Sequence, residues 1–379
     1  MLAFNLQPIA VRGLTGIGNY TAEVARRLID KDTELHAFDF LGRNGVRGIL
    51  EENLKMELGG NDLHIVRSLP LSAYIRMGSA GKILPYSTLT RSKADLTVFF
   101  NYLTPGGLKG KNVITIYDLV SERFPETMDA RNRRLLQGHL LDSASRASSA
   151  LTISQFSKRE IMDVLGVPEE NIFVGCCGVD TDFYTPGEGF TTGADKKFNI
   201  DGPYILYVGT LEPRKNIKTL VEAFGIIADK FPQVKLVLAG GKGWQPEETE
   251  RAIGESLYKD RIIRTGYVDN ETKRDLLRNA SVFVFPSIYE GFGMPVTEAM
   301  ACGTDCVVSE SSSLVEIGNG LLPLIPPKDV NLFAQAIEDK LMHPADQARK
   351  EQLRAHACTY TWDNAAEAAR CAIKHAYML

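Results

Sequence analysis

Short apolar segments with the character of β-strands alternate with amphipathic helical segments over almost the whole chain. This alternation constrains the fold most strongly, because it is typical of α/β proteins in which helices cover both faces of a parallel sheet. In the first half of the chain, strands are predicted at 2–6, 35–40, 96–100, 113–117, 150–153 and 171–175. Helices are predicted in that half at 20–29, 130–143 and 155–165.

A second alternating series begins at Tyr204 and predicts a second α/β domain. Its strands are predicted at 204–208, 235–239, 262–265, 281–285 and 305–308. Its helices are predicted at 217–229, 248–257, 271–279, 329–341 and 345–357, with a last helix at 362–377. The segment 177–200 between the two series is rich in Gly, Thr and Asp without periodicity, which indicates a linker.

The length of 379 residues suits two domains, predicted at 1–185 and 186–361. Two doubly wound domains of this kind would face each other across a cleft. In such sheets ligands bind beyond the carboxyl ends of the strands. Candidate functional residues are therefore sought in the loops that follow strands.

Composition excludes several classes of function. The net charge of −4 argues against a general nucleic-acid-binding protein. Six Cys without CxxC spacing and six scattered His predict a reducing compartment and no metal site. The first residues do not resemble a signal peptide, and no stretch of about 18 apolar residues occurs, so a cytoplasmic protein is expected.

The segment from Pro286 to Gly303 carries the strongest functional signal, because it places Glu290 and Glu298 on either side of a predicted helix start. Pro295 fits the first position of that helix, and Gly303 fits its stop. Free backbone N–H groups of 291–296, together with the helix dipole, would attract a phosphate. A phosphate flanked by two carboxylates that can bind hydroxyls suits a nucleotide sugar.

A second group, Gly209 to Asn216, directly follows a predicted strand. Gly209 permits a tight turn there, and Arg214 and Lys215 bring two cations to the start of the next helix. Cations are unfavourable at a helix N-terminus unless an anion is bound, so the pair indicates a site for a diphosphate leaving group. The alternative is a solvated Arg-Lys pair.

Two loops of the first half are weaker candidates. Residues 12–20 are Gly-rich, and Gly16 and Gly18 could approach a phosphate closely, but Thr21 breaks the G-x-G-x-x-G pattern of dinucleotide-binding proteins. The loop is equally well interpreted as a plain turn. Asp118 ends a predicted strand and faces the predicted cleft, or else caps the next turn.

Three further segments leave alternatives open. The backbone of Gly266, Tyr267 and Val268 could pair with a nucleobase edge or form an ordinary loop. The serines of 309–313 could bind phosphate or form a polar loop. The segment 63–94 has five cations, interleaved apolar residues and no acidic residue, so it could contact an anionic membrane or a lipid-diphosphate acceptor. A solvated basic face is the alternative for 63–94.

Taken together, these motifs resemble family 4 of the retaining glycosyltransferases. The run EGFGMPVTEAMACGT resembles the E-x7-E region of that family, and YVGTLEPRKNIKTLVEAF and the Gly-rich loop resemble its other donor-site regions. The resemblance covers essentially the whole chain. It implies the GT-B fold, with two Rossmann-like domains and a final helix, 362–377, that returns to the N-terminal domain.

The resemblance also implies residue roles. Glu290 would bind hydroxyls of the donor sugar, and Glu298 those of the ribose. The predicted catalytic residues are Asp118, Arg214, Lys215 and Glu290. The predicted donor-binding residues are Gly16, Gly18, Gly209, Thr210, Gly266, Tyr267, Val268, Gly291, Phe292, Gly293, Met294, Pro295, Val296 and Glu298.

Two positions depart from the family pattern. Many members have Arg at the position of Thr210, so Arg214 would supply that charge here. Many also have His-Asp where this chain has Tyr117 and Asp118, which puts in doubt any mechanism that uses that His.

The motifs TLEPRKN and IYDL look most like those of bacterial polysaccharide and O-antigen mannosyltransferases. We therefore expect transfer of a mannosyl unit from GDP-mannose to a glycan or lipid-linked glycan, with retention and without metal or cofactor. A transferase with a UDP-sugar donor, a nucleotide-sugar 2-epimerase and a non-catalytic sugar-nucleotide binder are the alternatives. An NAD-dependent oxidoreductase is disfavoured by the incomplete dinucleotide pattern.

Overall fold

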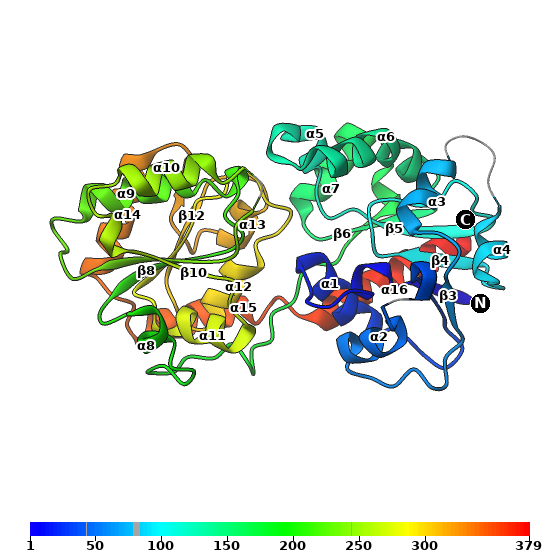
Figure 1. The fold of residues 1–379 in the computed structure, drawn as a ribbon, viewed down its shortest axis with the longest axis horizontal. Helices are drawn as coiled ribbons and strands as arrows, with labels where there is room; N and C mark the ends of the chain where they lie inside the picture. Colours follow the sequence, from blue (N-terminus) through cyan, green and yellow to red (C-terminus); the bar gives the residue numbers. More distant parts are fainter. Residues whose placement is uncertain (43, 79–83, 244) are drawn as a thin grey trace. The chain divides into compact units, whose positions relative to one another are not determined.

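The computed structural model describes residues 1–42, 44–78, 84–243 and 245–379. Contacts divide the chain into two units. The first unit consists of Met1–Arg123, Ala130–Cys177 and Trp362–Leu379, and the second consists of Phe124–Asp129 and Gly178–Thr361. Each unit contains one parallel β-sheet with helices on both faces, as Figure 1 shows.

The sheet of the first unit has the strand order β3-β2-β1-β4-β5-β6-β7. Its strands are β1 (Leu2–Asn5), β2 (Glu34–Phe38), β3 (Leu63–Val66), β4 (Leu96–Phe99), β5 (Lys111–Thr115), β6 (Ser149–Thr152) and β7 (Ile172–Val174). All described pairings are parallel, so the carboxyl ends of the strands share one edge. Buried side chains of the central strands form the core, because both faces are covered by helices.

Two groups of helices cover this sheet. The helices are α1 (Gly16–Arg26), α2 (Val46–Leu54), α3 (Leu71–Gly78), α4 (Tyr86–Thr90), α5 (Val120–Arg123), α6 (Ala130–Ser145), α7 (Gln155–Leu165) and α16 (Trp362–Met378). In Figure 1, α1 and α16 lie on one face, and α5, α6 and α7 lie on the other. The C-terminal helix α16 contacts β4 to β7 and α1 through a stripe of buried alanines.

The sheet of the second unit has the strand order β10-β9-β8-β11-β12-β13. Its strands are β8 (Tyr204–Val208), β9 (Lys235–Ala239), β10 (Ile262–Gly266), β11 (Val282–Phe285), β12 (Cys306–Ser309) and β13 (Leu324–Ile325). Its helices are α8 (Ala194–Phe198), α9 (Ile217–Ile227), α10 (Glu247–Glu255), α11 (Asn270–Asn279), α12 (Met294–Ala301), α13 (Leu314–Gly318), α14 (Val330–Met342) and α15 (Gln347–Ala357). Figure 1 shows α9, α10 and α14 on one face and α11, α12 and α15 on the other.

The segment predicted as a linker is part of the second unit. Contacts divide after Cys177, earlier than the predicted boundary at 185/186. The buried carboxylate of Asp275 in α11 accepts hydrogen bonds from the backbone N–H groups of Thr191 and Thr192, both 2.7 Å long. The lack of periodicity correctly indicated irregular backbone in this segment, but the segment packs against the second unit and is not a flexible linker.

The Gly-rich loop of the first unit is also different from the prediction. Helix α1 begins at Gly16 rather than Tyr20, because the hydroxyl of Thr15 caps it by accepting the N–H of Gly18 at 3.3 Å. Gly16 and Gly18 thus lie in the first turn of a helix. Strand β3 was missed because it is a half-buried edge strand that contains the polar residue His64.

Candidate functional site

Two cations converge on one buried carboxylate in the second unit. The Lys215 ammonium Nζ lies 2.6 Å from Oε1 of Glu290, and the Arg214 guanidinium Nη1 lies 3.0 Å from Oε2 of the same carboxylate. Arg214 also pairs with Glu212 at 2.7 Å. The solvated Arg-Lys pair is excluded, because the side chains of Arg214 and Lys215 are only 16% and 12% exposed.

The charges of this cluster fix its protonation. Burial alone would raise the pKa of Glu290, but the charges of Lys215 and Arg214 outweigh it and lower the pKa to about 2. Burial and the neighbouring Arg214 lower the pKa of Lys215, against the opposing effect of Glu290. Glu290 is therefore ionised at neutral pH and cannot donate a proton there.

The two loops that carry the cluster are tied to each other. The side-chain amide of Asn216, which stands between the loop after β8 and the start of α9, donates to the backbone oxygens of Pro286 and Pro327 at 3.0 and 2.6 Å. The backbone N–H of Ile288 donates to the Arg214 oxygen at 2.9 Å. These bonds fix the distance between the cations and the loop that carries Glu290.

Glycines let the loop after β8 pack closely on the loop after β9. Gly209 adopts φ 152°, and an ideal Cβ there would lie 2.6 Å from the Tyr207 hydroxyl. A Cβ on Gly240 would lie 1.9 Å from the Gly209 oxygen, so neither position has room for a side chain. Thr210 follows this turn, and its backbone oxygen accepts the Tyr207 hydroxyl at 3.1 Å.

Serines after β12 hold the loop that carries Glu290. The hydroxyl of Ser312 accepts the backbone N–H of Glu290 at 2.8 Å, and the hydroxyl of Ser313 lies within 2.9 Å of the oxygens of Glu290 and Phe292. The serine run at 309–313 therefore holds the loop that carries Glu290 in place. The position of these serines after a buried strand indicated a functional loop, but the sequence alone did not show which loop they contact.

The start of α12 presents backbone N–H groups, as predicted in part. Val296 is an exception, because its N–H donates to the Gly293 oxygen at 2.9 Å. No acceptor within the described residues is recorded for the N–H groups of Phe292, Gly293 and Met294. Pro295 has no backbone N–H and so cannot donate a hydrogen bond to a ligand. Gly293 adopts φ 125°, and a Cβ on it would lie 2.7 Å from Cδ2 of Leu314.

Glu298 lies in the first turns of α12 and is paired with a residue that sequence reasoning missed. The ammonium of Lys273 in α11 donates to Oε1 of Glu298 at 2.8 Å. Oε2 of Glu298 is shielded from solvent and has no hydrogen-bond partner among the described residues. A buried acceptor without a partner costs free energy unless a ligand supplies a donor.

The remaining predicted donor-site residues of this unit are more open. Gly266 ends the strand β10 with φ 70° and is exposed, and the Tyr267 side chain is 80% exposed. Val268 is half-buried and precedes the Asp269 cap of α11. Gly291 is buried beside Glu290.

The predicted residues of the first unit form their own local arrangements. Asp118 follows β5, and its Oδ1 accepts the N–H of Val120 at 3.2 Å, which is the capping role considered above. The neighbouring Tyr117 is 3% exposed, and its hydroxyl donates to the Phe100 oxygen at 3.2 Å. Burial raises the pKa of the Tyr117 hydroxyl, so it keeps its proton at neutral pH.

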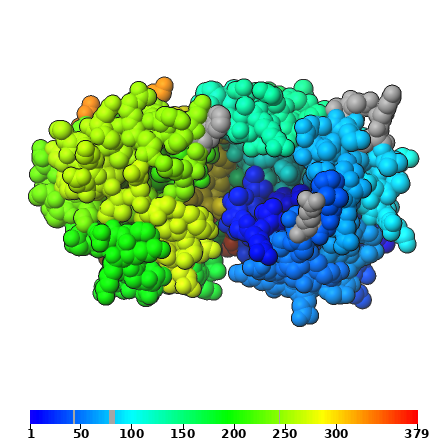
Figure 2. Space-filling view, viewed as in Figure 1, coloured from blue at the N-terminus to red at the C-terminus, as the bar shows by residue number. Residues whose placement is uncertain are grey.

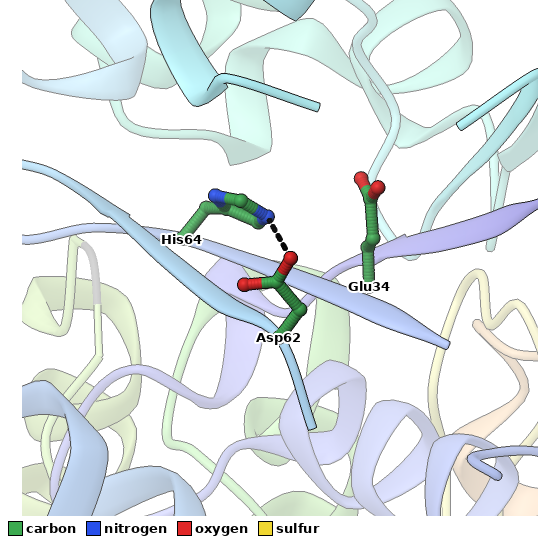
Figure 3. A group of neighbouring side chains, drawn as sticks. All are labelled: Glu34, Asp62 and His64. Carbon is green, nitrogen blue, oxygen red and sulfur yellow. Dashed lines mark ion pairs between the residues drawn. The ribbon is translucent and has the colours of Figure 1, made fainter. Parts of the chain in front are cut away.

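One group of potential metal ligands occurs among the described residues. Glu34 in β2, His64 in β3 and the preceding Asp62 each place one ligand atom within 4.8 Å of the others. Figure 3 shows the His64 ring directed toward Asp62, with Glu34 on the neighbouring strand. The Glu34 carboxylate already accepts the hydroxyl of Ser92 and the N–H of Lys93, so it ties β2 to the turn after α4.

Comparison with known proteins points to glycosyltransferases. Residues 192–356, which contain the whole cluster around Glu290, match the family model described as glycosyl transferases group 1. The chain carries a glycosyl transferases group 1 domain. The O-antigen chain mannosyltransferase B of Escherichia coli is 27% identical over 379 residues and is covered to 96%, as is this chain.

Two further proteins are similar to this chain, one in sequence and one in fold. The serotype-specific mannosyltransferase WbdA of E. coli is 28% identical over 274 residues, which are 68% of this chain and 33% of WbdA. The solved sucrose-phosphate synthase from Thermosynechococcus elongatus superposes with a TM-score of 0.73 at 19% identity, covering 100% of this chain and 99% of the synthase. The glycosyltransferase therefore has the expected GT-B fold.

Proposed function

We propose that this glycosyltransferase moves a mannosyl unit from GDP-mannose to a glycan or lipid-linked glycan, with retention at the anomeric carbon, in bacterial polysaccharide synthesis. The domain and its O-antigen mannosyltransferase relatives support transfer of a hexose. The observation that carries the proposal is the convergence of Arg214 and Lys215 on Glu290 beside the start of α12. It combines a diphosphate-binding pair with a carboxylate that stays ionised.

The chemistry assigned to the cluster is electrostatic. Negative charge grows on the diphosphate as its bond to the sugar breaks, and preorganised cations stabilise that charge. Arg214 and Lys215 are held in place by Glu290 and Glu212, so little reorganisation accompanies the reaction. Retention follows when the acceptor hydroxyl attacks on the face that the diphosphate leaves, and the departing phosphate oxygen takes the hydroxyl proton. No protein nucleophile is then required.

The two carboxylates take different parts of the donor in this proposal. Glu290 would accept hydroxyls of the sugar, since its low pKa keeps it an acceptor. Glu298 would accept hydroxyls of the ribose through Oε2, for which the described residues provide no hydrogen-bond partner. Backbone N–H groups of Phe292 to Met294 would face phosphate or sugar oxygens.

Donor identity is tested by ligand-induced stabilisation and by transfer. A ligand that binds only the folded protein raises its unfolding midpoint, so GDP-mannose is compared with UDP-glucose and UDP-N-acetylglucosamine. We expect the largest shift with GDP-mannose, followed by transfer of mannose with the α-anomeric configuration retained. A larger shift with either UDP-sugar contradicts the mannose assignment. Conversion of the donor to its 2-epimer without acceptor would identify an epimerase instead.

We also propose that segment 63–94 contacts an anionic membrane surface. Met77 and Leu84 are 49% and 61% exposed, and the described parts of this segment, 63–78 and 84–94, reach the surface of the first unit in mid-blue to cyan in Figure 2. Residues 79–83, which include Lys82, lie outside the described residues. None of the described helices is both long and apolar enough to cross a bilayer.

Sedimentation with vesicles tests the contact of segment 63–94 with a membrane. We expect binding to phosphatidylglycerol vesicles but not to phosphatidylcholine vesicles, and Arg76→Glu should weaken this binding. Equal binding of the wild type and of Arg76→Glu to phosphatidylglycerol vesicles contradicts the proposed contact.

A further inference from the structure

We propose that Lys273 and Tyr184 are positioning residues that direct one oxygen of Glu298, Oε2, toward the ribose of the bound nucleotide. The inference rests on the proposed function and deepens it, because it assigns ribose recognition to a three-residue arrangement. Lys273 comes from α11, Glu298 from α12, and Tyr184 from the irregular segment 178–193. All three belong to the second unit.

Lys273 occupies one oxygen of the carboxylate and leaves the other. Its ammonium donates to Oε1 of Glu298 at 2.8 Å, with the two side chains 17% and 12% exposed. Since a charge-assisted hydrogen bond in a shielded place is strong and directional, it fixes the rotation of the carboxyl group. Oε2 is left shielded from solvent and has no hydrogen-bond partner in the part of the chain that the structure describes.

Tyr184 provides the second contact to this pair. The Lys273 ammonium lies 5.2 Å from the centre of the Tyr184 ring, which is within the range of a cation–π contact. The phenol lies beside the carboxylate: burial raises the pKa of the Tyr184 hydroxyl, and the negative charge of Glu298 and a hydrogen bond to its side chain raise it further. The hydroxyl therefore keeps its proton at neutral pH and remains a donor.

The segment that carries Tyr184 is fastened at both ends. Arg354 in α15 donates to the backbone oxygens of Thr181 at 2.8 Å and Tyr184 at 3.1 Å, and also to the Ala301 oxygen at the end of α12. Asp275 in α11 accepts the N–H groups that follow Phe190. The segment is thus held to the two helices that supply Lys273 and Glu298.

The geometry predicts a specific ligand preference. A ribose offers two neighbouring hydroxyl donors, whereas a 2′,3′-dideoxyribose offers none. A carboxylate oxygen that is already desolvated and correctly oriented gains most from such a donor. Discrimination between the two sugars therefore depends on Lys273 and Tyr184, although neither residue needs to touch the nucleotide.

Calorimetric titration of GDP and 2′,3′-dideoxy-GDP tests the inference, with UDP and its dideoxy analogue measured in parallel. We expect the wild type to prefer the ribose form about tenfold. Lys273→Met should weaken GDP binding about tenfold and leave dideoxy-GDP binding unchanged. Tyr184→Phe should weaken GDP binding about threefold, and Lys273→Arg should restore most of the preference.

The controls separate positioning from a general effect. Lys230→Met removes an exposed lysine of the same unit, paired with Glu338, and should change neither affinity. Equal loss of GDP and dideoxy-GDP affinity in Lys273→Met would overturn the inference, because it would show a direct contact or a structural effect. A wild type that binds both forms equally would also overturn it, while the proposed donor stands. If no nucleoside diphosphate binds the wild type, the proposed function itself fails. If Lys273→Met does not fold, Lys273→Arg and Tyr184→Phe decide the question.

Discussion

Arg214 and Lys215 illustrate at the scale of single residues why a charge pattern predicts a site but not its geometry. Two adjacent cations after a strand indicated an anion site, yet nothing in the sequence showed that both side chains reach Glu290, which lies 75 positions beyond Lys215. We predict that Arg214→Ala and Lys215→Ala each lower kcat roughly 100-fold, since single electrostatic donors of this kind have such effects. Steady-state transfer rates measure this change.

A nearby lysine provides the control for this prediction. Lys218 lies three positions beyond Lys215 but is 48% exposed and pairs with Glu248 at 3.2 Å. Lys218→Ala should leave kcat within about twofold of the wild type, because exposed ion pairs contribute little. Normal activity of both Arg214→Ala and Lys215→Ala, with unchanged unfolding midpoints, would contradict the assignment of diphosphate binding to this cluster.

Glu290 also predicts a pH dependence of stability. Its pKa is about 2 in the folded protein and near its ordinary value of 4.5 in the unfolded chain. A lowered pKa contributes stability that is fully present above 4.5 and is lost as pH falls from 4.5 toward 2. Denaturant unfolding should therefore show that Glu290→Gln is less stable than the wild type at pH 7, with a smaller difference at pH 3. A difference that is constant over this range would contradict the assignment.

At the scale of elements, α12 and the loop before it depend on one glycine. Gly293 adopts φ 125°, and a Cβ would meet Leu314 at 2.7 Å. We predict that Gly293→Ala lowers the free energy of unfolding by about 1–3 kcal/mol and weakens nucleotide binding, because the start of α12 must shift. Gly225→Ala, in α9 with open space around it, should instead be neutral or slightly stabilising. Denaturant titration and thermal shift with GDP distinguish the two variants.

The sequence predicted the elements of the second unit more closely than those of the first. The buried strands β8 and β9 were predicted at their observed bounds, because continuous apolar runs of about five residues mark them. The edge strand β3 and the short helix α8 have no such runs and were missed. Lys273 was also missed, and the contact of Ser313 with the Glu290 loop was not predicted, since both contacts join residues that are far apart in sequence.

At the scale of the whole molecule, two local groups of ionisable side chains lie in different units. The cluster of Glu290 with Lys215 and Arg214 lies in the second unit and brings two cations together. The potential ligands Glu34, Asp62 and His64 belong to the other unit, where Glu34 is engaged by Ser92 and Lys93.

This division leads to a prediction about metal dependence. If the two cations provide the electrostatic stabilisation, dialysis against EDTA should leave the rate of mannosyl transfer unchanged, and added Mg²⁺ or Mn²⁺ should not increase it. The same dialysis should leave the unfolding midpoint unchanged, because the Glu34 carboxylate already accepts hydrogen bonds from Ser92 and Lys93. Loss of activity that a divalent ion restores would contradict the first expectation. A loss of stability that His64→Ala reproduces would contradict the second, and would locate a structural ion at Glu34, Asp62 and His64.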